Sequence, residues 1–242
     1  MTHAPKEPSC PRLLACDDGT ASMTDRPRRS GWTWTPARHD VALSLRWATF
    51  LSVLFFSVYG LCNWFTAQRE TRYRLWFDWE LGIPFVPEMI WVYLSLCASF
   101  FLPMFALRAP ALNALCKRLA VAVVSSGVVF LMLPAQTGFV RSAAAAEQSA
   151  AFHFLYSMDL PHNLVPSLHV SWSALAVLSL RSASPAWLCR ALEVWFVALC
   201  LSVLLVHQHH VLDVAGGTLV AWAAKRAVRD DGAWTWPFWR QS

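Results

Sequence analysis

The sequence predicts an all-α membrane protein, a polytopic bundle of about six transmembrane helices. Hydrophobic residues make up 56% of its 242 residues and charged residues only 14%, whereas soluble domains carry about 25% charged residues. The apolar residues gather in runs that approach the roughly 20 residues needed to cross a bilayer. The cations stand at the ends of these runs, where membrane topology places them, so the net charge of +5 does not indicate a nucleic-acid partner.

Three regions follow from composition. Residues 1–40 are rich in Pro, Arg, Ser and Thr and lack the apolar run of a secretory signal peptide, so they form a predicted disordered cytoplasmic tail. Residues 41–226 form the predicted transmembrane domain, and residues 227–242 a second cytoplasmic tail. The seven cysteines are scattered and mostly within or beside apolar runs, which indicates buried apolar side chains and neither a disulfide framework nor a metal cluster.

The predicted domain contains five apolar runs, at residues 41–65, 89–107, 119–133, 165–180 and 192–224. The last run is too long for one span, and four consecutive polar residues, His207 to His210, interrupt it. Hydrocarbon would penalise these residues by several kcal/mol. We therefore expect two helices joined by a tight turn, which makes six spans.

Lysines and arginines predict the orientation of these spans. They cluster in three short connections, at residues 108–118, 181–190 and 225–229, which the positive-inside rule places on the cytoplasmic side with the N-terminal tail. Segments 66–87 and 134–164 and the histidine turn then face outward. Residues 143–158 are expected to form a short helix at the membrane surface, which is a lid, a lipid guide or a simple connector.

Three polar clusters meet at this outer side: Arg141, the segment 163–169, and His209 with Asp213. His209 and Asp213 are four residues apart and share a helix face, so the carboxylate can hold one imidazole nitrogen and leave the other as a nucleophile. His169 is then the candidate general acid. Arg141 and the helix start at Ser167 are the candidate phosphate-binding groups.

Each cluster also has a simpler explanation. A His-x-x-x-Asp pair is often a satisfied polar pair, His169 beside Pro166 and Ser167 can cap a helix, and Arg141 can anchor the chain at the interface. Ionisable groups at membrane depth are nevertheless rare and are functional by default. The presence of all three clusters on the same side of the membrane therefore favours a functional site.

Pro166-Ser167-Leu168-His169 and the segment from His209 to Asp213 resemble two motifs of the type 2 phosphatidic acid phosphatase (PAP2) superfamily. The resemblance covers roughly residues 131–224. It implies His169 as the acid, His209 as the nucleophile that forms a phosphohistidine, and Asp213 as its partner. No cofactor or metal is expected, because the site has too few acidic residues to hold a hard cation. The lysine and proline of the family's first motif and the Ser-Arg that opens its third motif are absent, which leaves Arg141 as the phosphate clamp. The Pro-Ser-Leu-His sequence is similar to that of inositol phosphorylceramide synthase-like membrane proteins.

The resemblance implies a lipid phosphatase that acts on phosphatidate or a polyprenyl diphosphate, within the bilayer of the plasma (inner) membrane and with its site on the extracytoplasmic side. A headgroup phosphotransferase of the inositol phosphorylceramide or sphingomyelin synthase type is the alternative. A haem- or metal-binding membrane protein is a third hypothesis, since several histidines could serve as ligands. These are His162, His169, His207, His209 and His210. The lipid, the acceptor and the oligomeric state stay open.

Overall fold

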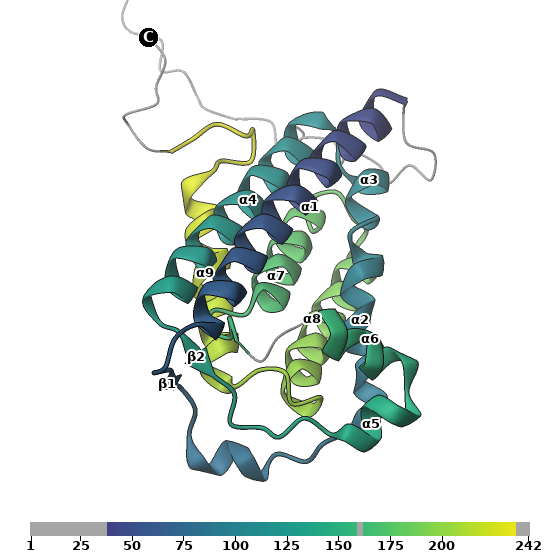
Figure 1. The fold of residues 1–242 in the computed structure, drawn as a ribbon. Coiled ribbons are helices and arrows are strands. Elements are labelled where there is room, and N and C mark those ends of the chain that lie inside the picture. The colour runs from purple at the N-terminus through teal and green to yellow at the C-terminus, as the bar shows by residue number, and fades with distance from the viewer. Residues whose placement is uncertain (1–37, 159–161, 236–242) are drawn as a thin grey trace, which may run out of the picture.

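The computed structural model describes residues 38–158 and 162–235, and this part of the chain is mostly helical (Figure 1). The all-α prediction is therefore confirmed for the described residues. The predicted N-terminal tail lies outside them, apart from its last three residues, which begin the first helix. Residues 236–242 of the predicted C-terminal tail also lie outside them.

The helices are α1 (Arg38–Ala67), α2 (Ile90–Ser99), α3 (Leu102–Ala106), α4 (Ala109–Met132), α5 (Ala143–Gln148), α6 (Ala150–Met158), α7 (Leu168–Leu180), α8 (Ala186–Leu205) and α9 (Val211–Ala227). Two 3-10 turns, η1 (Asp78–Gly82) and η2 (Pro87–Met89), precede α2. By length and composition, α1, α4 and α8 can cross a membrane, and α7 is a shorter apolar helix. A membrane protein is thus supported, while the full set of six spans is not confirmed.

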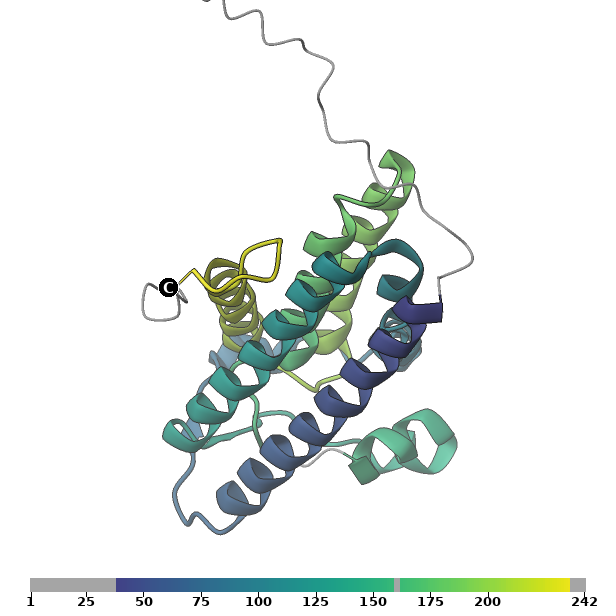
Figure 2. The same cartoon turned by 90° about the horizontal axis from the view of Figure 1, so that it is seen from above.

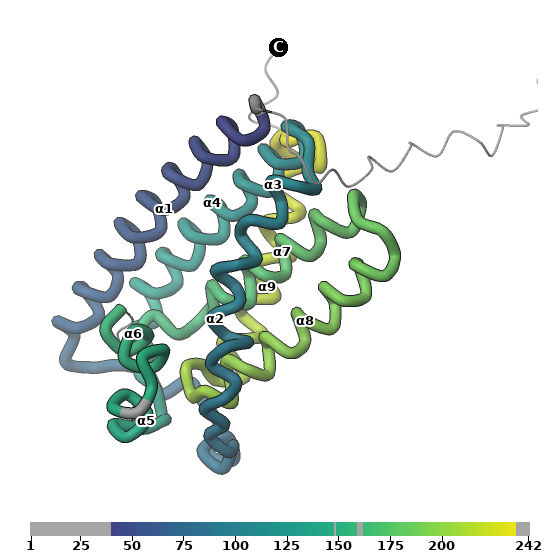
Figure 3. The backbone as a smooth tube through the Cα atoms, turned by 90° about the vertical axis from the view of Figure 1, so that its right-hand side faces the viewer, coloured from purple at the N-terminus to yellow at the C-terminus, as the bar shows by residue number. Residues whose placement is uncertain are grey.

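Helix α7 occupies the centre of the bundle. It packs against α2, α3, α4, α8 and α9 (Figure 3). Most of its side chains are buried. Two of its serines satisfy their hydroxyls within the helix: Ser171 donates to the Leu168 carbonyl at 3.2 Å and Ser173 to the His169 carbonyl at 2.7 Å. Back-bonding of this kind lets polar side chains lie in an apolar interior.

Helix α1 lies along α4, as the view from above shows (Figure 2). The crossing is close at Gly127, where an added Cβ would lie 2.4 Å from the Val58 side chain. The other face of α1 exposes large apolar side chains such as Phe50, Val53 and Phe56. Exposed apolar faces of this kind suit contact with lipid.

The structure differs from the expected connections at α4. This helix begins at Ala109, with Pro110 in its first turn, so Arg118 lies inside a helix and not in a loop. Arg118 is only 2% exposed, and it donates to the Val228 carbonyl and to Asp230, both at 2.8 Å. The buried charge is therefore compensated by the segment after α9, which the sequence pattern does not reveal.

The irregular segments lie at one end of the bundle. The two-residue strand β1 (Tyr73–Arg74) pairs in parallel with β2 (Ala135–Gln136), which ties the segment before α2 to the segment after α4. The helix expected over residues 143–158 is present as α5 and α6, which are interrupted at Ser149 and lie beside this end (Figure 1). The ends of α1, α4 and α8 and the starts of α2, α7 and α9 meet here.

Candidate functional site

His209 lies in the turn between α8 and α9 and is held by Asp213. Its Nδ1 lies 3.1 Å from Oδ2 of Asp213, and the two side chains are only 8% and 1% exposed. The same oxygen accepts the backbone N–H of His210 at 2.8 Å. Because a carboxylate only accepts, it places the proton of His209 on Nδ1 and leaves a lone pair on Nε2. The predicted pairing of His209 with Asp213 is present in the structure.

The backbone explains why this turn forms. The amides of Gln208 and His209 both donate to the Val203 carbonyl, at 3.1 and 3.0 Å, while His207 adopts a φ of 57°. This is how a helix ends when its next residue is left-handed. Helix α9 then starts after His210, and Asp213 in its first turn reaches back to the His210 amide. A single carboxylate thus caps the helix and orients His209.

His169 lies close to His209, from a different helix. It is the second residue of α7, and the centroids of the two imidazole rings are 5.8 Å apart. The hydroxyl of Tyr93, on α2, lies 3.4 Å from Nδ1 of His169, and the two rings are 4.3 Å apart. The predicted cluster of His169, His209 and Asp213 is therefore brought together in space.

Close contact between α7 and α9 sets the distance between these histidines. The backbone N–H of Ser167 donates to the Asp213 carbonyl at 3.0 Å, and a Cβ at Gly217 would lie 2.5 Å from the Ser167 carbonyl oxygen. The Ser167 hydroxyl, fully buried, accepts the amide of Val170 at 3.4 Å and so caps α7. The first amides of α7 have no partner within the helix and give this end a partial positive charge, which suits an anion.

Arg141 lies on the loop between β2 and α5, with its guanidinium 4.8 Å from the centre of the Tyr156 ring. The same loop reaches the histidine turn through Gly138 and Phe139. The amide of Gly138 donates to Nε2 of His210 at 3.1 Å, and Phe139 stacks on the rings of His207 and His210 at 4.0 and 4.3 Å. Binding of phosphate by Arg141 and Ser167 stays a prediction.

Sequence reasoning missed a second buried pair of a histidine and a carboxylate. Glu80, in η1, has no exposed surface, and His210 is 1% exposed. Oε2 of Glu80 lies 3.0 Å from Nδ1 of His210 and accepts the Val211 amide at 2.9 Å, while Oε1 accepts the Phe77 amide at 3.0 Å. The only signal in the sequence is an acidic residue in a stretch rich in aromatic residues, which gives no hint of its partner.

His210 is neutral in this arrangement. Its Nε2 accepts the Gly138 amide, so the ring proton lies on Nδ1 and is donated to Glu80. Burial lowers the pKa of His210, and this outweighs the nearby carboxylates of Asp213 and Glu80, which raise it. His209 is therefore the histidine with a free nitrogen beside His169, whereas both nitrogens of His210 are used within the fold.

The haem or metal hypothesis gains no support from residues 38–158 and 162–235. Within these ranges no group of three or more His, Cys, Asp and Glu residues could hold a metal ion. His207 instead contacts the Ile83 carbonyl at 2.9 Å, and the nitrogens of His210 are occupied as above.

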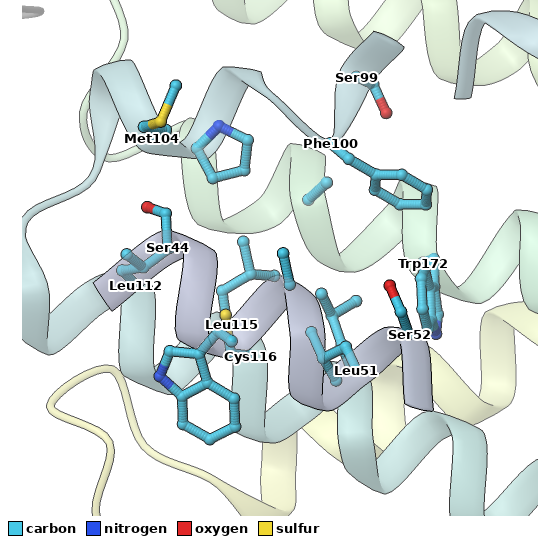
Figure 4. A pocket seen from close by; sticks show the side chains of 15 residues that line it. Ser44, Leu51, Ser52, Ser99, Phe100, Met104, Leu112, Leu115, Cys116 and Trp172 are labelled. Carbon is cyan, nitrogen blue, oxygen red and sulfur yellow. The ribbon is translucent and has the colours of Figure 1, made fainter. Parts of the chain in front are cut away.

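An apolar cavity of about 170 Å³ lies deeper in the bundle, among α1, α2, α3, α4 and α7 (Figure 4). Trp172 and Ala176 line it from α7, on the turns that follow His169. Its hydroxyl groups include those of Ser44 and Ser99, which donate to carbonyls of their own helices at 2.8 and 2.7 Å. Most of the other lining side chains, such as Leu51, Leu115 and Leu119, are apolar, so the walls suit hydrocarbon better than water.

Nothing matches this chain among protein-family models, curated proteins or solved structures. The functional interpretation therefore depends on the geometry of the site and on the chemistry of its residues.

Proposed function

We propose that the protein is a membrane lipid phosphatase of the PAP2 type, which hydrolyses a phosphate ester or anhydride of a lipid through a phosphohistidine at His209. One observation carries the proposal. Nδ1 of His209 contacts the buried carboxylate of Asp213, and the ring centroid of a second histidine, His169, lies 5.8 Å from that of His209. A nucleophile with its orienting group and a separate acid are the parts that two-step phosphoryl transfer needs.

In the first step, Nε2 of His209 attacks phosphorus and the bond from phosphorus to the lipid oxygen breaks. His169 donates its proton to that leaving oxygen. In the second step, water attacks phosphorus, the bond to His209 breaks, and His169 accepts the proton of the water. Asp213 stabilises the imidazolium that forms in between, as the carboxylate does in a Ser-His-Asp triad.

Charge on the phosphoryl oxygens needs fixed donors. The amides at the start of α7, the Ser167 hydroxyl and Arg141 are the proposed ones. Arg141 is attached to the site through its loop, because Gly138 and Phe139 of that loop contact His210. A planar guanidinium can hold two phosphoryl oxygens at once.

The proposed membrane arrangement has six spans: α1, α2 with α3, α4, α7, α8 and α9. Cations at the end opposite the site include Arg108 before α4 and Lys225 and Arg226 in the last turn of α9, and they support a cytoplasmic location for that end. The site then faces the extracytoplasmic side of the plasma membrane. The apolar cavity, which Trp172 lines one turn after His169 in α7, supports a substrate with a hydrocarbon chain.

One observation favours the headgroup phosphotransferase as a second candidate. A cavity of about 400 Å³ lies between η2 with the start of α2 and the helices α5 and α6. It is lined by Glu88, Trp91, Ser142 and Ser149 among others, and Ser142 directly follows Arg141. A cavity of this size can take the alcohol that would replace water in the second step.

The test is turnover by the purified protein in vesicles that contain phosphatidate or a polyprenyl diphosphate. We expect release of inorganic phosphate, and no release by His209→Ala inserted to the same level. A new phosphodiester that forms only when an alcohol is added would favour the phosphotransferase. Neither product with any lipid phosphate would reject both.

A further inference from the structure

The proposed reaction uses His209 and Asp213 but leaves the buried pair of Glu80 and His210 without a role. This pair joins three segments that are distant in sequence. Glu80 comes from the segment before α2, Gly138 from the loop that carries Arg141, and His210 from the turn that carries His209. All three meet at one imidazole ring.

We propose that Glu80 and His210 are positioning residues for this reaction: they hold the nucleophile turn and the Arg141 loop in one fixed arrangement. The inference rests on the proposed function. Neither residue is a catalytic residue, since the contacts of Glu80 and of both ring nitrogens of His210 are made within the fold.

The cost of burying these groups argues against a purely packing role. A buried carboxylate and imidazole must be desolvated, and apolar residues of similar volume often stabilise a fold as well or better. A fully satisfied polar network gives a specific arrangement instead. Here the network is complete, because Glu80 accepts three N–H groups and His210 donates one proton and accepts one.

The network also borders the reacting groups directly. His210 follows His209 in the chain, and its backbone amide donates to the same Asp213 oxygen that holds the His209 ring. On the other side, Gly138 is three residues before Arg141. A shift of His210 therefore moves the nucleophile and the proposed phosphate clamp together.

Aromatic rings fix the plane of the His210 side chain. Trp76 stacks on it at 5.3 Å and Phe139 at 4.3 Å. An added Cβ at Gly138 would lie 2.6 Å from the Trp76 ring, so the loop can approach only as glycine. The charged and titratable groups around this ring are Glu80, Asp213, His209, His207 across Phe139, and Arg74 over Trp76.

The experiment compares Glu80→Gln with Glu70→Gln, a change of the same chemistry at an exposed residue on the same side of the bundle. Glutamine offers one acceptor oxygen where Glu80 uses two, so either the Phe77 amide or the His210 and Val211 donors lose their partner. A displacement of about 1 Å costs about 10²-fold in rate. We expect Glu80→Gln to lower kcat by about 10- to 100-fold with KM unchanged, and Glu70→Gln to behave as wild type.

Two further measurements separate positioning from folding. His210→Asn places an amide nitrogen near the position of Nδ1 and can still donate to Glu80, so it should retain more turnover than His210→Ala. Hydrogen exchange at the Gly138 amide, recorded without substrate, should become faster in Glu80→Gln and stay unchanged in Glu70→Gln.

The outcomes are distinct. If wild-type protein turns over no lipid phosphate, the proposed function fails, while the exchange data still test the network. If wild type is active and Glu80→Gln keeps its kcat, or changes only KM, the positioning role is overturned. Unchanged exchange at Gly138 in Glu80→Gln would overturn the coupling between the two loops.

Discussion

Replacing Asp213 with asparagine removes one negative charge from the site and little else. Asp213 is 1% exposed, and its Oδ2 accepts both the His209 ring and the His210 amide. Asparagine has the same shape and one acceptor oxygen. Because the His210 amide needs an acceptor at this position, the amide oxygen of asparagine takes the place of Oδ2, and the His209 proton stays on Nδ1.

The expected loss follows from what asparagine retains. In a Ser-His-Asp triad the same substitution lowers kcat by about 10⁴-fold because the histidine also adopts the wrong tautomer. Here the tautomer is kept and only the charge that faces the imidazolium is lost. We therefore expect kcat to fall by about 10²- to 10³-fold, equivalent to about 2.7 to 4 kcal/mol, the range for losing one stabilising group in the transition state.

The assay is phosphate release from a lipid phosphate in reconstituted vesicles, with substrate at saturation and equal insertion of each variant. Asp231→Asn is the matched control, since Asp231 is an exposed carboxylate at the opposite end of the bundle and its ion pair with Arg229 is also at the surface. Asp213→Ala should lose more than Asp213→Asn, because two donors then lack an acceptor. Wild-type turnover in Asp213→Asn would refute the role of Asp213 as orienting group.

Four other predictions follow from the same site. His169→Ala should slow lipid phosphates much more than nitrophenyl phosphate, whose leaving group needs no acid; equal losses on the two substrates count against His169 as the acid. Arg141→Lys should lose most of the turnover, since an ammonium cannot hold two oxygens with paired donors; a retained rate identifies Arg141 as an interfacial anchor. Gly217→Ala should lower the free energy of unfolding of the purified protein by about 1 to 3 kcal/mol, because its Cβ would lie 2.5 Å from the Ser167 carbonyl oxygen. An unchanged thermal unfolding curve would contradict the close contact of α7 and α9. The pKa of His210 is lowered by burial, so its contribution to stability is present above about pH 6.5 and is lost as the pH falls from there to the lowered pKa; thermal unfolding of His210→Gln should show a weaker pH dependence over this range, and an equal one contradicts the assignment.

Local patterns were enough to predict the helical class and the cluster of His169, His209 and Asp213. The distance of four residues between His209 and Asp213 places both at the start of one helix, and such a contact needs no knowledge of the rest of the fold. His169 followed from topology, because alternating spans bring the starts of the helices that carry it and Asp213 to the same end. Both predictions agree with the geometry.

The contacts that the sequence did not reveal are long-range ones. Glu80 and His210 are 130 residues apart, and neither periodicity nor charge pattern links a glutamate in an irregular segment to a histidine in a turn. Arg118 likewise resembled a loop cation because its partners, Val228 and Asp230, come from the far end of the chain. Buried charges are paired by tertiary structure, which single-sequence patterns do not encode.

The boundaries of α4 were missed for the same reason. Lys117 and Arg118 directly precede the apolar run that begins at residue 119, so the helix was expected to start after them. It starts at Ala109 because the Lys117 ammonium reaches the Gly232 carbonyl at 2.8 Å and Arg118 is paired, which removes the penalty for placing both within a helix.

The most direct test of the account is to identify the phosphorylated residue. A lipid substrate with a radioactive phosphate is mixed with the protein, the reaction is stopped with alkali in milliseconds, and the labelled peptide is identified by mass spectrometry. We expect a label on His209 that is stable to alkali and labile to acid. It should be absent from His209→Ala and should accumulate in a variant whose second step is slowed. A label on His210, Ser167 or a cysteine, or steady turnover with no labelled protein under any quench, would contradict it.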